Sequence, residues 1–133
     1  MQNSNAIQRS ETVVVGAALT TLDVLNLLGL TDYVAVSVTN NSGQALIDFQ
    51  VQLQMHPDDP FLAEFVAADF SASPPPVGDE LRRLRGNPST LAAGQTATFT
   101  LKAYKSTHAV QFQAQTTSGT ANVTIRTTRV QDG

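Results

Sequence analysis

Residues Ile47 to Met55 read IDFQVQLQM, an unbroken alternation of apolar and polar side chains. A period of two gives a β-strand one buried face and one solvated face. Upstream, Val34 to Thr39 alternates in the same way, and Asn40-Asn41-Ser42-Gly43 between the two runs supplies residues that tolerate a chain reversal. These two runs therefore predict a hairpin.

The last third of the chain repeats this alternation in three runs with turn signals between them. We expect a three-strand meander there, and two weaker candidates bring the expected strands to about seven. The three runs are residues 97–103, 110–114 and 121–125, and the weaker candidates are Val13 to Ala17 and Phe61 to Ala67. This pattern is typical of an all-β antiparallel sandwich.

Three segments fall outside the alternation. Residues 22–28 fit either a helical turn or a continuation of the first strand, because periodicity does not decide over so short a run. The polar residues 1–10 predict an extended N-terminal arm. Ser71 to Ser89 contains Pro74-Pro75-Pro76 and then residues 79–86, whose acidic start and basic end predict a short capped helix. We expect this long segment to form a crossover or arm on the surface.

Composition excludes several classes of function. A length of 133 residues suffices for a single domain, residues 1–133, and a hydrophobic fraction of 41% argues against disorder. The chain has no Cys and two His, which removes thiol catalysis and zinc clusters. A net charge of −3 argues against a nucleic-acid partner. The apolar stretch Val13 to Leu30 contains Asp23 and Asn26, so we assign it to the core rather than to a membrane, and no secretory signal precedes it.

Charge is segregated along the chain. No Lys or Arg lies between Arg9 and Arg82, whereas the cations that follow Glu80 meet no acid until Asp132. Either the two halves mingle within one sandwich, or an acidic patch on one copy meets a basic patch on the next. The candidate interface residues are arginines, which suit a partner's carboxylates, and aromatics beside the Pro-rich segment, which fit a core role as well: Arg9, Phe61, Phe65, Arg82, Arg83 and Arg85.

No constellation of catalytic or cofactor-binding residues stands out. His56-Pro57-Asp58-Asp59-Pro60 is the one place where a His and two carboxylates are close together in sequence. Its prolines predict a tight loop that closes the preceding strand, with the Asp side chains capping backbone amides, rather than a metal site. His108 has no evident acid–base partner in sequence. We therefore expect no enzyme activity, no cofactor and no metal.

The run Val34 to Thr39, the turn Asn40 to Gly43 and the later stretch Leu91 to Leu101 resemble the strand-and-turn pattern of immunoglobulin-like adhesion and surface modules. A cysteine-free, Thr- and Gln-rich sandwich also resembles the small structural proteins of tailed-phage virions, such as capsid decoration proteins. The resemblance implies a non-enzymatic assembly protein, made in the host cytoplasm, which is homo-oligomeric or bound to the lattice of a virion protein. The alternatives are a carbohydrate- or protein-binding module with its site on the loops, and a small hydrolase or metal enzyme.

Overall fold

The chain is all-β wherever its structure is described. The computed structural model describes residues 5–27, 33–67, 70, 81–83, 86–102 and 107–131, of which 5–6, 63–67, 81–83, 102 and 130–131 are described by backbone alone. These residues form nine strands and no helix. The strands are β1 (Asn5–Val15), β2 (Thr20–Asn26), β3 (Tyr33–Gly43), β4 (Leu46–Gln54), β5 (Leu62–Ala67), β6 (Leu81–Arg83), β7 (Thr96–Lys102), β8 (Ala109–Thr116) and β9 (Ala121–Gln131).

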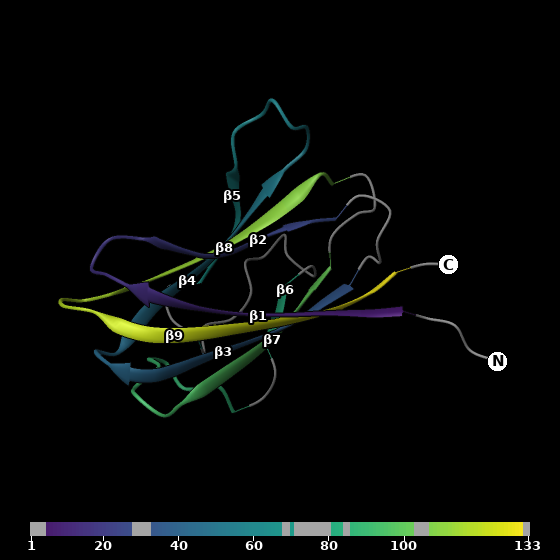
Figure 1. The fold of residues 1–133 in the computed structure, drawn as a ribbon. Coiled ribbons are helices and arrows are strands. Elements are labelled where there is room, and N and C mark those ends of the chain that lie inside the picture. Colours follow the sequence, from purple (N-terminus) through teal and green to yellow (C-terminus); the bar gives the residue numbers. More distant parts are fainter. Residues whose placement is uncertain are drawn as a thin grey trace.

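The strands form two antiparallel sheets, with the orders β1-β9-β3-β7-β6 and β2-β8-β4-β5 (Figure 1). The pairs β1/β9, β2/β8, β3/β7 and β4/β5 are nested one inside the next. The chain is therefore one long two-stranded ribbon that closes at the β4–β5 turn and winds across both sheets. This is the strand arrangement of a jelly roll, with β6 added at one edge.

This strand order corrects the immunoglobulin-like topology expected from the sequence. An immunoglobulin sandwich keeps its first two strands in one sheet, whereas β1 and β2 lie in different sheets. The expected hairpin is wrong because β3 and β4 lie in different sheets, and the expected meander is wrong because β8 lies in the sheet opposite β7 and β9. Alternation identifies the buried face of a strand but does not identify its neighbours.

The described residues form nine strands rather than the expected seven, and the two additional strands are β2 and β6. In β2, a bulge between Thr21 and Asp23 turns the consecutive Leu22 and Asp23 both inward. The short helix expected over residues 79–86 is wrong at its centre, because Leu81–Arg83 pairs with β7. The other side of β7 is bonded to β3, so its open edge offers backbone partners that outweigh a weak local helix preference. Residues 71–80 and 84–85 lie outside the described residues.

The prediction of an extended N-terminal arm over residues 1–10 is also wrong from Asn5 onward. The whole of β1 pairs in register with β9, from Asn5 opposite Gln131 to Val15 opposite Ala121. Met1 to Ser4 lie outside the described residues. Backbone hydrogen bonds along eleven residues make this segment part of the five-stranded sheet.

The core lies between the sheets and centres on Phe49. Its ring stacks on Phe99 at a centroid distance of 4.6 Å, and Phe70 and Phe112 pack at 5.9 and 6.0 Å. The expected core assignment of the apolar stretch is confirmed for the buried residues Val15, Leu22, Leu25 and Leu27, whereas Val14, Leu19 and Val24 are exposed. None of the described residues forms a helix long and apolar enough to cross a membrane.

Candidate functional site: the outer faces and the hairpin tip

Arg9, a candidate interface residue, binds a partner within its own chain. Its Nε and Nη2 donate to the two carboxylate oxygens of Asp23 on β2 at 3.0 and 2.9 Å. The Val24 amide also donates to this carboxylate at 2.9 Å, and the Asp23 side chain is 7% exposed. The hydrogen bonds and charge of Asp23 raise the pKa of Arg9 above its ordinary value. Arg9 therefore joins the neighbouring edges of the two sheets.

The other candidate interface residues are placed only in part. Phe61 is half-buried just before β5. Phe65 lies in β5 and both Arg82 and Arg83 lie in β6, but their side chains are outside the described part of the chain, as is the whole of Arg85. A role for these residues in contacts between copies stays a prediction.

Arg126 is an arginine that the sequence reasoning did not single out. It lies exposed on β9, on the outer face of the five-stranded sheet. Arg129, three residues further along β9, donates from Nη1 to the Asn26 carbonyl at 2.7 Å. Burial together with the charge of Arg9 lowers the pKa of Arg129. Within the described residues, Arg126 makes neither a hydrogen bond nor an ion pair. It is therefore a free cation in the described part of this face.

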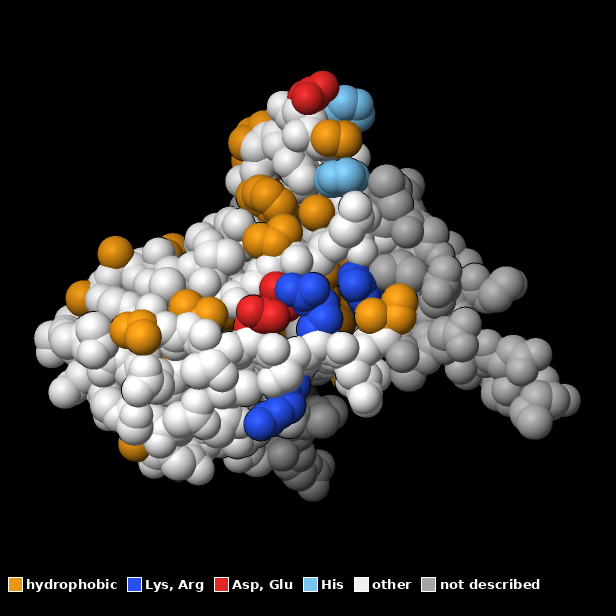
Figure 2. Space-filling view, in the orientation of Figure 1, with side chains coloured by type: hydrophobic (Ala, Val, Ile, Leu, Met, Phe, Trp, Pro, Cys, Tyr) orange, Lys and Arg blue, Asp and Glu red, His pale blue; other side chains and the backbone are white. Residues whose placement is uncertain are grey.

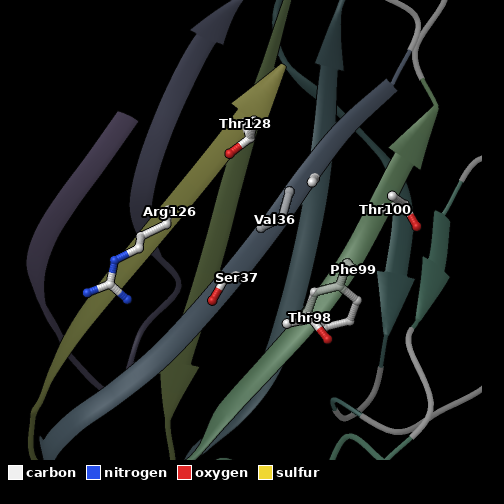
Figure 3. A pocket seen from close by; sticks show the side chains of 8 residues that line it. Val36, Ser37, Thr98, Phe99, Thr100, Arg126 and Thr128 are labelled. Carbon is white, nitrogen blue, oxygen red and sulfur yellow. The ribbon is translucent and has the colours of Figure 1, made fainter. Parts of the chain in front are cut away.

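Small side chains hollow the surface beside Arg126. Figure 3 shows Arg126 and Thr128 from β9 on one side of the hollow, Thr98 and Thr100 from β7 on the other, and Ser37 from β3 between them. The hollow has a volume of about 320 Å³ and is lined by Ala35, Val36, Ser37, Thr98, Phe99, Thr100, Arg126 and Thr128. A second depression of about 260 Å³ lies between β1 and β9, and Arg126 lines it too. The free guanidinium thus stands between two depressions in a hydroxyl-rich surface.

Glutamines cover the outer face of the four-stranded sheet. They occupy alternate positions of β4 (Gln50, Gln52, Gln54) and β8 (Gln111, Gln113, Gln115). Gln111 Nε2 donates to Gln52 Oε1 at 2.6 Å, and Gln52 Nε2 donates to Gln113 Oε1 at 2.8 Å. Asp48 is the carboxylate described on this face, opposite Gln115, and burial raises its pKa. Among the described side chains, this face is largely polar and Asp48 is its one charged group.

The turn between β4 and β5 forms a tip that projects from the sandwich (Figure 1). The tight loop expected at His56 to Pro60 is confirmed, because the Asp59 amide donates to the His56 carbonyl at 2.9 Å and Gln54 Nε2 donates to the Asp59 carbonyl at 2.7 Å. His56 Nδ1, rather than an Asp side chain, accepts from the Asp58 amide at 3.1 Å. The Asp58 side chain is left 91% exposed. Figure 2 shows acidic and histidine side chains together at this tip.

The described residues bring no metal ligands together. They contain no cluster of three His, Cys, Asp or Glu side chains that could hold an ion. His56 Nδ1 lies 3.7 Å from Asp58 Oδ2, but both side chains are largely in solvent. His108 Nδ1 is buried without a hydrogen-bond partner among them. The arrangement is suited to binding at an open surface, because the hollows are shallow and only their rims carry charge.

Comparisons with known proteins do not assign a family. No protein-family model matches the chain, and no curated protein matches it. Among solved structures, the chain is similar to one described as "Bacillus endospore appendages form a novel family of disulfide-linked pili", with a TM-score of 0.44 and 10% sequence identity over 98% of this chain and 93% of that chain. At that level the match carries no inference about function. The present chain has no cysteine and so cannot form disulfide links.

Proposed function

We propose that this chain is a non-enzymatic structural assembly protein that works through contacts between rigid sandwiches. The observation that carries the proposal is the scarcity of charge among the described side chains of the two outer faces. Arg126 and Asp48 are the charged side chains described on them, while the register also places the backbone of Arg82 and Lys102 on the Arg126 face. Soluble surfaces carry about 25–35% charged residues, whereas the centres of protein interfaces are depleted of charge. Faces on which so few described side chains are charged therefore favour contact with other subunits.

The proposed setting is a virion, in which the chain acts as a capsid decoration or stabilising protein. Its partners are then other copies of itself and a capsid protein. The jelly-roll strand order supports this setting by analogy, because viral capsid domains use that architecture. Since lectins and cupins use it as well, the analogy is weaker support than the outer faces are.

The test is the mass of the purified chain by light scattering after size exclusion, at low and high salt and at two concentrations. Multimers whose mass grows with concentration support assembly; they persist at high salt if the charge-poor faces hold them and loosen as salt rises if charged groups hold them. A monomer under every condition contradicts self-assembly in solution. Mass spectrometry of purified particles from the source of the sequence tests the virion setting separately.

Carbohydrate binding is the second candidate function. It is favoured by the glutamine face and by the hydroxyl-lined hollow, which place hydrogen-bond donors and acceptors at the fixed spacing of a sheet. Such groups suit sugar hydroxyls. Glycan-array binding by a chain that stays monomeric would favour this candidate over assembly.

A further inference from the structure

We infer that the β4–β5 tip of one copy docks into the Arg126 hollow of the next, where the Asp58 and Asp59 carboxylates pair with the guanidinium. The inference rests on the proposed function and deepens it, because it names the contact that joins the copies. Loop residues 55–61 and the residues that line the hollow belong to the described part of the chain.

Charge is the first reason to join these two surfaces. Arg126 is exposed and makes no interaction within the described residues. The Asp58 side chain is 91% exposed and reaches only His56, at 3.7 Å. A guanidinium presents a planar fork of donors that matches carboxylate oxygens. The tip and the hollow therefore each offer the group that the other lacks.

Shape and stiffness are the second reason. The hollow is open and shallow because its floor on β3 consists of Ala35 and Ser37, between longer side chains on β9 and β7. The tip is convex, and Pro57, Pro60 and the Gln54 side chain hold its backbone in one turn. A loop that is ordered before binding loses little conformational entropy when it docks.

Exposed apolar side chains lie at the base of the same tip. Met55, just after β4, and Leu62, the first residue of β5, flank the loop and are 54% and 62% exposed. A docked tip would bring them near the small, partly apolar lining around Ala35. Burial of their apolar surface would stabilise the contact in addition to the ion pair, because removing apolar surface from water is favourable.

The placement of the two surfaces determines the kind of assembly. The tip extends the four-stranded sheet, whereas the hollow lies on the outer face of the five-stranded sheet. In Figure 1 the β4–β5 turn is at the top of the molecule, whereas β3, β7 and β9, whose residues line the hollow, are in its lower half, so a copy does not fill its own hollow. A contact between two different surfaces is heterologous and propagates as an open filament or closes into a ring. Each copy gives one tip and receives another.

Complementation between two variants tests the inference. Arg126→Glu disables the hollow and keeps the tip, whereas Asp58→Asn with Asp59→Asn disables the tip and keeps the hollow. Each variant alone is expected to bind itself at least about tenfold more weakly than wild type. An equimolar mixture is expected to give a heterodimer and nothing larger, because one intact tip meets one intact hollow. Light scattering measures the masses, and circular dichroism checks that both variants fold.

One further variant is a control, and another is a second test of the hollow. Glu11→Gln removes an exposed acid on β1, away from the tip, and should assemble like wild type. Ala35→Leu fills the floor of the hollow without a change of charge and should block docking as Arg126→Glu does.

The outcomes separate this inference from the proposed function. If wild type forms multimers and both the hollow and tip variants do so equally well, the tip contact is wrong while assembly stands. If the two variants fail alone and also fail to pair when mixed, the heterologous contact is wrong. A wild type that stays monomeric at every concentration overturns both. Binding of polygalacturonate through Arg126 by such a monomer would make the hollow a site for an acidic polysaccharide instead.

Discussion

Replacement of Arg9 by Ala tests whether this residue stabilises its own chain or meets a neighbour. The substitution removes two hydrogen bonds of 2.9 and 3.0 Å from the Asp23 carboxylate, whose side chain is 7% exposed. Loss of one partner from a fully buried ion pair costs about 3–5 kcal/mol. Because the Arg9 side chain is 41% exposed, solvent screens the pair and can reach the carboxylate. We expect the free energy of unfolding to fall by about 2 kcal/mol.

A double-mutant cycle isolates the pair from other effects of the substitution. Arg9→Ala, Asp23→Ala and the double variant are unfolded in urea and followed by far-ultraviolet circular dichroism. The protein is kept at concentrations where light scattering shows a monomer, because assembly adds to apparent stability. We expect a coupling energy of about 1–2 kcal/mol. Glu11→Ala is the matched control, since Glu11 Oε2 lies 3.7 Å from Arg9 in solvent and should contribute under about 0.5 kcal/mol.

A coupling energy below about 0.3 kcal/mol, the error expected for independent sites, would refute the reasoning. If Arg9→Ala then lowered multimer mass without a change in the urea midpoint, Arg9 would be the contact between copies that the sequence predicted. If Arg9→Ala lowers the free energy of unfolding and leaves the multimer mass unchanged, Arg9 stabilises the fold of its own chain rather than a contact between copies.

Three further predictions concern stability, and urea unfolding checks each of them. Phe49→Ala should cost about 3–5 kcal/mol, because the fully buried ring packs on three others, while Phe49→Leu should cost clearly less. Gly43→Ala should cost more than Gly94→Ala: both have positive φ, but a Cβ at Gly43 would lie 2.5 Å from the Thr120 carbonyl oxygen, whereas one at Gly94 meets nothing within 4 Å. Equal costs would contradict that clash. Burial raises the pKa of Asp48 in the folded state, so the folded chain keeps this proton to higher pH than the unfolded chain does, and stability falls as pH rises through that folded-state pKa. The free energy of unfolding of Asp48→Asn should therefore rise relative to that of wild type between about pH 3 and pH 7. A difference between the two proteins that stays constant across that range would contradict burial of Asp48 as the cause.

The alternation of IDFQVQLQM predicted the buried face of one strand well, but not at its ends. Phe49, Val51 and Leu53 are buried as expected. A bulge between Leu46 and Asp48 puts Leu46 into the core in place of Ile47, and Met55 lies beyond the end of the strand. Bulges depend on the partner strand, so a period of two along one strand does not reveal them.

The sequence contained a signal for Arg126 that was not used. Val123 and Ile125 are apolar at alternate positions, so Arg126 falls on the opposite face beside neutral threonines. What the sequence could not show is which arginines already have partners. Arg9 meets Asp23 because β1 and β2 lie at neighbouring edges of two sheets and a bulge turns Asp23 inward. The neighbouring edges and the bulge are both features of the folded sheets, so neither can be recognised along the sequence.

The nested ribbon also bears on the segregated charges, for which the sequence left two explanations. The ribbon pairs early strands with late ones, and in the five-stranded sheet this puts β1, with Glu11, beside β9, with Arg126 and Arg129. The Arg9–Asp23 pair shows one charge pair made within a copy, although both residues come from the early part of the chain. Within the described residues, Asp58 at the closed end of the ribbon contacts only His56, and Arg126 on β9 makes no ion pair. If copies do join, these two charges can meet only between molecules, so the assembly should weaken with salt while the fold of each copy does not.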